Sequence, residues 1–291
     1  MSITTTALKK RYGDTVALDD VDIDVPTGSV YGLVGPNGAG KTTLLGILGR
    51  LRRPTSGTVQ VGGFRIAVLP DTPRFDGWLT GREVVDLARA MAHPAPVESA
   101  TDAMLDAAGL AEVAHRRVGG YSRGMLQRLG LAAAVVGDPD VLLLDEPAAA
   151  LDPAGRREVL DLIGAIRRRA TVLFSSHILD DVQEVCDHVG ILRRGELVYQ
   201  GTLEGLLRGR ATATYVVELR SGAPEVAEAL AGAPWVKEAT AENDTHIRVE
   251  VTSYDAAEVG LVPLLAALGR PVISVAPHAE TLERVFLEVT Q

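Results

Sequence analysis

The sequence predicts an α/β fold with a mainly parallel core sheet. Residues 30–34, 141–144 and 171–174 are short apolar runs without polar alternation, which is typical of strands buried on both faces. Helical patterns begin near Lys41 and cover residues 156–169, so strands and helices alternate along the chain. This alternation is typical of a parallel sheet whose strands are joined by helices.

Two smaller subdomains are expected beside this sheet. An antiparallel β-subdomain is predicted from strands at residues 2–8 and 21–25, and a short antiparallel segment at residues 59–68 indicates that it is trimmed. A helical subdomain is predicted in the middle of the chain, where Thr80 and Glu83 have the spacing of a capping box. The helices predicted there begin after residue 80, cover residues 97–108 and extend from the cap residue 122 to residue 134.

A second domain is expected at the C-terminal end. The pattern changes between residues 206 and 213, and we place the boundary there, between domains of residues 1–208 and 209–291. The second domain is predicted to be a small α+β domain of the split βαβ type. Its predicted strands are residues 214–219, 236–240, 245–251 and 271–275, and its predicted helices are residues 225–231, 256–268 and 281–289.

The composition excludes several classes of protein. The 291 residues contain 29 Lys and Arg against 38 Asp and Glu, and the formal charge of -9 argues against a general nucleic-acid-binding protein. Cys186 is the only cysteine, so no disulfide can form within the chain, and its apolar helical neighbours predict core packing. No apolar run reaches the about 20 residues that a membrane-spanning helix needs.

A glycine-rich loop lies between the predicted strand at residues 30–34 and the helix that follows. It matches the P-loop pattern of Gly, four residues and Gly-Lys-Ser/Thr. Glycines let backbone N–H groups converge on phosphate oxygens, Lys41 reaches the β- and γ-phosphates, and the Thr42 hydroxyl can ligate Mg²⁺. The alternative is a glycine-rich turn with a solvated lysine. The predicted ATP-binding residues of this loop are Gly35, Pro36, Asn37, Gly38, Ala39, Gly40, Lys41, Thr42 and Thr43.

Two acidic residues follow the apolar run at residues 141–144. Asp145 and Glu146 are expected at the carboxyl end of a buried strand, which is where open α/β sheets bind ligands. Asp145 suits a Mg²⁺ contact, and Glu146 suits a base that orients or deprotonates an attacking water. The alternative is an acidic strand end or a helix N-cap, and the P-loop makes this alternative weaker.

Residues 120–128, Gly-Tyr-Ser-Arg-Gly-Met-Leu-Gln-Arg, resemble the signature motif of ATP-binding cassette (ABC) ATPases. As in that family, they lie between the P-loop and the acidic pair. The resemblance implies that the Ser122 hydroxyl and the Gly124 backbone bind the γ-phosphate of ATP held by a second subunit. The alternative is a capped helix without a ligand. The matching residues are Ser122, Gly124, Gln127 and Arg128.

The resemblance covers residues 2–208 and implies further site residues. Asp152 resembles the D-loop, and His177 resembles the switch histidine that contacts the γ-phosphate. Tyr12 resembles the aromatic residue that stacks on adenine, with a packing role in the first hairpin as the alternative. Residues 281–290 are similar to the ending of ATPase subunits of bacterial drug and polysaccharide-type exporters; the alternative is an appendage that supports folding or dimerisation.

The chain departs from the family pattern at three places. Asp71 stands where the family has the glutamine of the Q-loop, and we expect it to hold Mg²⁺ directly or through water. Arg123 and Met125 replace a glycine and a glutamine of the signature. Alanines at residues 148–150 replace the usual hydroxyl-bearing residues of the D-loop, which removes a possible hydrogen bond across a dimer.

The resemblance implies an ATP-binding and ATP-hydrolysing subunit of an exporter that works as a homodimer or heterodimer. It implies a separate membrane permease, docked around residues 71–78 with Arg74, Phe75 and Trp78, and a cytoplasmic subunit at the inner face of the cell membrane. No nucleic-acid partner is expected. The alternatives are a non-transport ABC ATPase acting on chromosomes or ribosomes, a P-loop kinase or nucleotide sensor, and a degenerate regulatory cassette.

Overall fold

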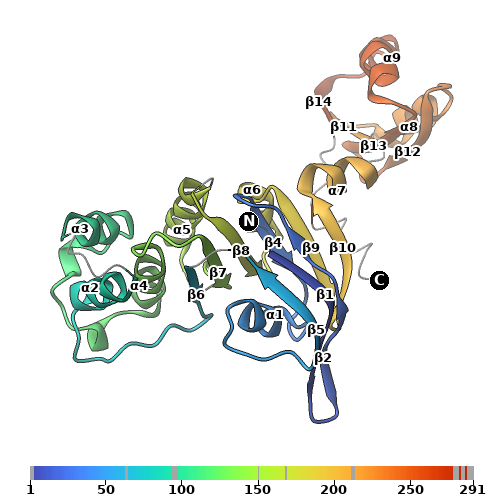
Figure 1. Cartoon of the computed structure of the whole chain (residues 1–291). Coiled ribbons are helices and arrows are strands. Elements are labelled where there is room, and N and C mark those ends of the chain that lie inside the picture. The colour runs from blue at the N-terminus through green and yellow to red at the C-terminus, as the bar shows by residue number, and fades with distance from the viewer. Residues whose placement is uncertain are drawn as a thin grey trace. The chain divides into compact units, whose positions relative to one another are not determined.

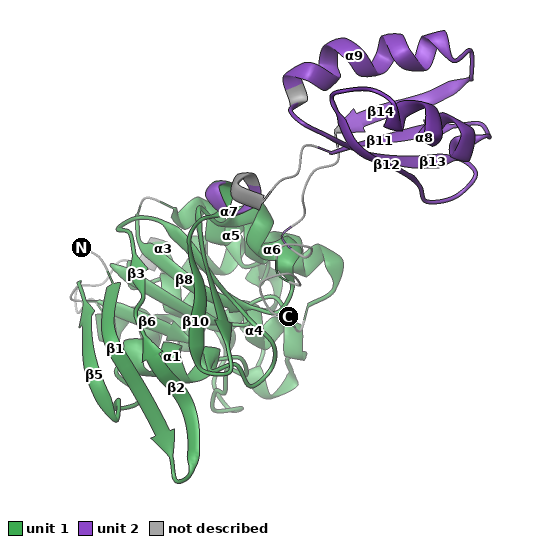
Figure 2. Ribbon diagram, turned by 90° about the vertical axis from the view of Figure 1, so that its right-hand side faces the viewer, with its two compact units in different colours: residues 1–204, 286–291 green, residues 205–285 purple. Residues whose placement is uncertain are grey.

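The computed structural model describes residues 3–62, 65–92, 98–149, 151–167, 169–210, 214–277, 282 and 286. Figure 1 labels its helices and strands. The chain divides into two compact units, residues 1–204 with 286–291, and residues 205–285 (Figure 2). In the described part of the chain, no helix combines the length and the hydropathy that crossing a membrane requires.

The predicted parallel core sheet is confirmed. Five of its six strands run parallel, and the sixth, β10, pairs antiparallel with β9 at one edge. All residues of β4, β7 and β8 are buried, as the unbroken apolar runs predicted. In sheet order the strands are β10 (Glu196–Thr202), β9 (His188–Arg193), β4 (Val30–Val34), β8 (Thr171–Ser176), β7 (Val141–Asp145) and β6 (Ile66–Leu69).

Helices connect the parallel strands. Helix α1 follows β4, α5 lies between β7 and β8, and α6 lies between β8 and β9. Helix α7 follows β10 and begins in the first unit, which ends at residue 204, so most of the helix belongs to the second unit. The bounds are Lys41–Leu48 for α1, Pro153–Ile166 for α5, Leu179–Val185 for α6 and Leu203–Arg210 for α7.

The antiparallel β-subdomain is present, with two corrections to the predicted strands. The strand predicted at residues 21–25 is interrupted, because the Thr5 hydroxyl donates to the Val21 carbonyl and accepts from the Ile23 N–H. The segment at residues 59–68 is antiparallel only in its first part, because β6 pairs parallel with β7 in the core sheet. The strands of the subdomain are β1 (Ile3–Tyr12), β2 (Thr15–Val21), β3 (Asp24–Val25) and β5 (Ser56–Val61).

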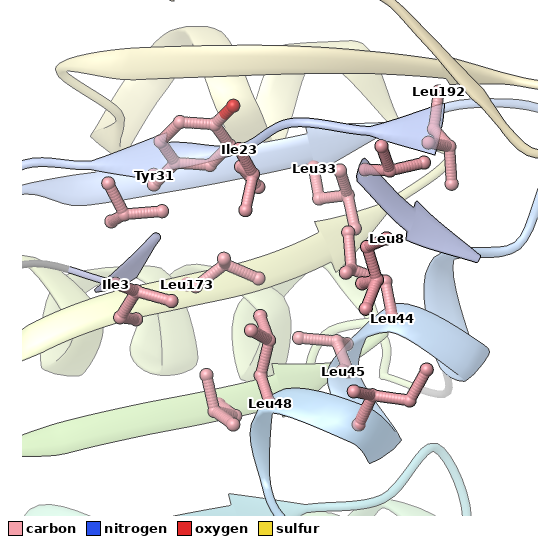
Figure 3. Close-up of a cluster of buried hydrophobic side chains, with 14 of the residues drawn as sticks. Ile3, Leu8, Ile23, Tyr31, Leu33, Leu44, Leu45, Leu48, Leu173 and Leu192 are labelled. Carbon is pink, nitrogen blue, oxygen red and sulfur yellow. The ribbon is translucent and has the colours of Figure 1, made fainter. Parts of the chain in front are cut away.

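The helix that follows the P-loop is anchored in the main core. Leu44, Leu45 and Leu48 of α1 are buried in one cluster with side chains from β1, β2 and the core sheet (Figure 3). Burying a leucine side chain contributes about 1.5–3 kcal/mol. The packing therefore holds the N-terminus of α1 at the end of β4. Other members of the cluster include Ile3, Leu8, Ile23, Tyr31, Leu33, Leu173 and Leu192.

The helical subdomain agrees with its predicted start signals. The Thr80 hydroxyl accepts from the Glu83 N–H, and the Thr80 N–H donates to the Glu83 carboxylate, which completes the capping box. Ser122 caps the third helix by accepting from the Met125 N–H at 3.2 Å. The three helices are α2 (Gly81–Ala92), α3 (Glu98–Ala107) and α4 (Arg123–Val135), with 3₁₀ turns at Ala111–Val113 and Val118–Gly120.

The second unit has the split βαβ arrangement that the sequence predicted. Its four strands are antiparallel, in the order β12-β13-β11-β14, and apolar residues of α8 and α9 pack with them in one core. The predicted C-terminal helix at residues 281–289 lies almost entirely outside the described residues. The elements are β11 (Thr214–Leu219), α8 (Ala223–Ala231), β12 (Val236–Ala241), β13 (His246–Val251), α9 (Tyr254–Ala267) and β14 (Val272–Pro277).

Cys186 is a core residue, as predicted. It is buried after α6, and a Cβ added to Gly32 would lie 2.9 Å from its Sγ. Burial raises the pKa of the Cys186 thiol well above its usual value, and the neighbouring Asp187 raises it further. The thiol is therefore neutral near pH 7, which fits packing and not nucleophilic chemistry.

Candidate functional site

The P-loop has the backbone that its glycines allow. Gly38 has a φ of 82° and Gly40 has a φ of 110°, a region that side chains rarely tolerate. A Cβ added to Gly40 would lie 2.6 Å from the Ala17 carbonyl oxygen, and one added to Gly35 would lie 2.2 Å from that of Leu192. Gly38 is therefore favoured by its φ, Gly35 by close backbone approach, and Gly40 by both.

Lys41 is the first residue of α1, and its side chain turns back over the loop. Its Nζ donates to the Gly35 carbonyl at 2.7 Å and lies 3.5 Å from Oε1 of Glu146. The residue is 6% exposed, so its ammonium group belongs to the wall of the site and not to bulk solvent. This geometry contradicts the alternative of a turn with a solvated lysine.

Asp145 ends β7 and Glu146 follows it, beside the polar end of β8. The Ser175 hydroxyl donates to Oδ1 of Asp145 at 2.6 Å and accepts from the Glu146 N–H at 3.0 Å. Glu146 has a φ of 50°, which is uncommon for a residue with a side chain and is typical of strained positions at functional sites. Ser175 thus orients both acidic residues, Asp145 by its side chain and Glu146 by its backbone.

His177 follows β8 and completes this group. Its Nδ1 lies 2.8 Å from Oε2 of Glu146, and its side chain is half exposed. Glu146 therefore lies between two nitrogen atoms, Nζ of Lys41 on one carboxylate oxygen and Nδ1 of His177 on the other.

These groups line one open cavity of about 710 Å³. Asp71, the residue in the Q-loop position, is exposed and lines it, and Thr72 donates a hydrogen bond to its carboxylate. Ala149 of the D-loop segment also lines it, whereas Ala150 lies outside the described residues. The other lining residues are Thr15, Val16, Ala17, Asn37, Gly38, Ala39, Gly40, Lys41, Thr42, Thr43, Pro70, Thr72, Arg123, Asp145, Glu146 and His177.

The structure places the signature residues elsewhere. Ser122, Gly124 and Asp152 line a separate depression of about 320 Å³ together with Gly155 and Glu158. Asp152 is also the N-cap of α5, where its side chain accepts from the Gly155 N–H at 2.8 Å. Most of the predicted ATP-binding residues therefore line two surfaces of one chain, one around the P-loop and one around the start of α4. Gly35, Pro36 and Tyr12 line neither.

Tyr12 is not among the residues that line the P-loop cavity. Its ring is 46% exposed, the Lys10 ammonium lies 4.8 Å from the ring centroid, and Arg52 donates to its hydroxyl at 3.2 Å. Val16, on the next strand, lines the cavity instead and is 41% exposed. Stacking of Tyr12 on adenine stays a prediction.

Three features of the site were missed by the sequence reasoning. Ser175 was not singled out, although it ends an apolar strand with a polar pair next to the strand that carries Asp145. Arg123 was noted only as a departure from the signature, yet it is among the residues that line the P-loop cavity. Residues 15–17 also line this cavity, and no motif marks them.

Comparisons with known proteins identify the family of the chain. The sequence profile of the family described as ABC transporter matches residues 18–149. The chain is 34% identical to the daunorubicin resistance ATP-binding protein DrrA3 of Streptomyces coeruleorubidus, over 99% of this chain and 96% of that protein. It is 39% identical to the bacitracin transport ATP-binding protein BcrA of Bacillus licheniformis, over 67% of this chain and 68% of that protein.

Solved structures show the same fold. One described as the ATP-binding subunit of an ABC transporter is 27% identical, with a TM-score of 0.66 over 72% of this chain and 93% of that one. A dimeric ATP-binding cassette in a post-hydrolysis state with ADP and phosphate is 22% identical, with a TM-score of 0.65 over 69% and 98% of the two chains. Since one relative matches almost the whole chain at 34% identity, the protein belongs to the ATP-binding proteins of ABC transporters and is an ATPase of that family.

Proposed function

We propose that this chain is the ATP-hydrolysing subunit of an exporter, and that it drives a separate membrane permease from the cytoplasmic face of the membrane. The observation that carries the hydrolytic part is the placement of Glu146, whose carboxylate lies within 3.5 Å of the P-loop lysine and 2.8 Å of His177. The relatives DrrA3 and BcrA are named for daunorubicin resistance and bacitracin transport, which supports an export role.

The P-loop side of the site would hold the nucleotide. Backbone N–H groups of the loop and the N-terminus of α1 would face the phosphates, and Lys41 would add a full positive charge. The side chains of Thr42 and Asp145 fit Mg²⁺, because hydroxyl and carboxylate oxygens are its usual protein ligands and both residues line the cavity. Asp71 would contribute a second carboxylate. Bound Mg²⁺ would neutralise part of the charge on the β- and γ-phosphates.

Glu146 would act on the attacking water. As a carboxylate it accepts the hydrogen bond that orients this water toward the γ-phosphorus, and the products are ADP and inorganic phosphate. His177 would hold the Glu146 carboxylate through Oε2 and contact the terminal phosphate. Ser175 would fix the backbone at Glu146 through its hydrogen bond to the N–H group.

Two copies would complete the ATPase. The cassette dimer with ADP and phosphate is a relative by fold, and its dimeric state supports the same assembly here. The depression around Ser122, Gly124 and Asp152 holds none of the P-loop residues, so it suits the phosphates of a nucleotide bound by the second copy. Homodimers and heterodimers with a related cassette are both compatible with this arrangement.

A groove in the first unit would receive the permease. It has a volume of about 490 Å³, lies between β6 and the helical subdomain, and is lined mainly by apolar residues. Arg74 and Phe75 line it, as does the exposed Met91, whereas Trp78 is 67% exposed and lies outside its lining. An apolar groove of this kind fits an amphipathic segment of a partner.

We further propose that residues 1–208 are the ATPase domain and residues 209–291 an accessory domain. The compact units with boundaries at residues 204 and 205 support this division, although residues 286–291 group with the first unit. The accessory domain would stabilise the dimer together with the C-terminal segment.

ATP binding and hydrolysis by the purified chain test this proposal. The wild-type chain should hydrolyse ATP in Mg²⁺, and Lys41→Ala should lose nucleotide binding. Addition of membranes that contain the cognate permease should stimulate the activity. A wild-type chain that binds ATP without hydrolysing it would instead identify a regulatory, degenerate cassette. Normal nucleotide affinity in Lys41→Ala would contradict the P-loop assignment itself.

A further inference from the structure

Arg123 links two surfaces of the chain that are otherwise separate. It is the first residue of α4, and it is among the residues that line the P-loop cavity of its own chain. The residues on either side of it, Ser122 and Gly124, line the other depression. The first turn of α4 therefore faces both surfaces. The family pattern has a glycine at the position of Arg123, so this chain has a charged side chain where the family has none.

The described lining of the P-loop cavity has more acidic than basic side chains. Its lining contains three carboxylates, from Asp71, Asp145 and Glu146, against the charges of Lys41 and Arg123. Lys41 is already engaged by the Gly35 carbonyl and Glu146. A triphosphate adds several negative charges to this surface, beyond those that Mg²⁺ would neutralise. Among the described residues that line the cavity, Arg123 is the cationic side chain without a hydrogen bond or ion pair.

The guanidinium group of Arg123 is free to bind a ligand. The residue is exposed, and within the described ranges its side chain has no hydrogen bond or ion pair. Other arginines of the same unit do have carboxylate partners, such as Arg128 with Glu158 and Arg156 with Asp181. Guanidinium groups bind phosphate oxygens through two parallel N–H donors.

We propose that Arg123 binds the terminal phosphate of the ATP molecule held by the P-loop of the same chain. The inner phosphates are served by the P-loop amides and the start of α1, whereas Arg123 approaches from the helical subdomain, a separate element. In a dimer, α4 would then contact its own nucleotide through Arg123 and the partner's nucleotide through Ser122 and Gly124. This inference rests on the proposed nucleotide site.

The first test compares ATP with ADP on the monomeric chain. Displacement of a fluorescent ATP analogue is measured in Mg²⁺, at a protein concentration at which sedimentation shows monomers. Arg123→Ala should weaken ATP binding about tenfold, as expected for the loss of a charge-assisted hydrogen bond, and change ADP binding less than twofold. Arg123→Lys should lie in between, and Arg169→Ala, at an exposed arginine after α5, should match the wild type.

The second test separates the two copies. One heterodimer joins a Lys41→Ala chain to an Arg123→Ala chain; the other joins a chain with both substitutions to a wild-type chain. Both carry the same two changes, but only the second leaves a working P-loop and Arg123 on one chain. The second heterodimer should hydrolyse ATP faster at subsaturating ATP.

Each result bears on one assignment. Three results would each overturn the role of Arg123. The monomeric Arg123→Ala chain could bind ATP as tightly as the wild type, or it could lose ATP and ADP affinity equally. The first heterodimer could also hydrolyse ATP faster than the second. Failure of the nucleotide site is recognised separately, because the Lys41→Ala chain would then bind ATP as tightly as the wild type.

Discussion

Nδ1 of His177 lies 2.8 Å from Oε2 of Glu146, at the ends of two neighbouring strands of the parallel sheet. The second carboxylate oxygen of Glu146 faces the P-loop lysine at 3.5 Å. The side chain of Glu146 is largely buried and its backbone has a positive φ, so its position is determined by its neighbours and not by its own preference. Lys41, Glu146 and His177 therefore have separate expected contributions to ATP binding and hydrolysis.

Glu146→Gln should trap the nucleotide-bound state. Glutamine keeps the shape and the contact with His177 but accepts no proton, so hydrolysis should fall by about 10²–10⁴-fold while ATP still binds. ATP should then accumulate in a dimer that elutes earlier in gel filtration, and ADP should not produce it. Rapid turnover by this variant would show that another group activates the water.

His177→Ala should separate catalysis from binding. The imidazole holds one oxygen of Glu146 and is half exposed, so its removal should lower kcat by about tenfold or more and change KM for ATP little. His177→Gln, which can still donate a hydrogen bond to Glu146, should recover part of the rate. Steady-state ATPase assays and unfolding curves separate this role from a purely structural one. If His177 were only structural, any substitution that restores the unfolding midpoint would also restore kcat.

Gly40→Ala should damage the P-loop even though it adds a single methyl group. The φ of 110° and the 2.6 Å approach to the Ala17 carbonyl leave no place for a Cβ, so the change should cost about 1–3 kcal/mol and lower ATP affinity. Gly164→Ala is the matched control, because that glycine lies within α5 with no atom near its added Cβ. It should stabilise the chain by about 0.5–1 kcal/mol with normal ATP affinity, as measured by urea unfolding and nucleotide titration.

Much of the fold could be predicted because its signals are local. The buried strands β4, β7 and β8 are continuous apolar runs, and the caps at Thr80 and Ser122 each mark a helix start. The break after Val21 could not be predicted, because the Thr5 hydroxyl that creates it comes from another strand. No strand was predicted for residues 188–202, and Val189 was expected on the helix face of Cys186; these residues form β9 and β10. The residues of β10 are exposed or partly exposed, and the strand depends on pairing with β9.

The candidate site was predictable in composition but not in arrangement. The P-loop and the acidic pair are recognisable because their chemistry needs fixed residue types at fixed spacing. Sequence spacing does not show that Ser122 and Arg123 face different cavities, because this depends on how the helical subdomain packs on the core. It also does not show that Ser175 lies beside Asp145, which follows from the register of β7 with β8.

The capping box of α2 should make folding sensitive to acid. Hydrogen bonds from the Thr80 N–H and hydroxyl hold the pKa of Glu83 below its usual value. Because the folded pKa is the lower one, this stabilisation is present above the unfolded pKa of about 4.3 and is lost as the pH falls through the folded pKa. Glu83→Gln should therefore show a smaller loss of stability than the wild type when urea unfolding is followed from pH 6 to pH 3. If the free energy of unfolding falls equally steeply with pH in Glu83→Gln and in the wild type, protonation of Glu83 does not affect stability.

The apolar groove beside the helical subdomain should be needed for coupling and not for hydrolysis. Met91 lines it and is 81% exposed, so Met91→Glu should leave folding and basal ATPase activity intact. The glutamate would bury a charge in the contact with the permease. Stimulation of the ATPase by permease-containing membranes should therefore fall about tenfold, which corresponds to a loss of about 1.4 kcal/mol at the interface. Val259→Glu, at an equally exposed apolar residue of α9, is the control and should retain full stimulation. If both variants are stimulated like the wild type, the permease docks on another surface of the first unit.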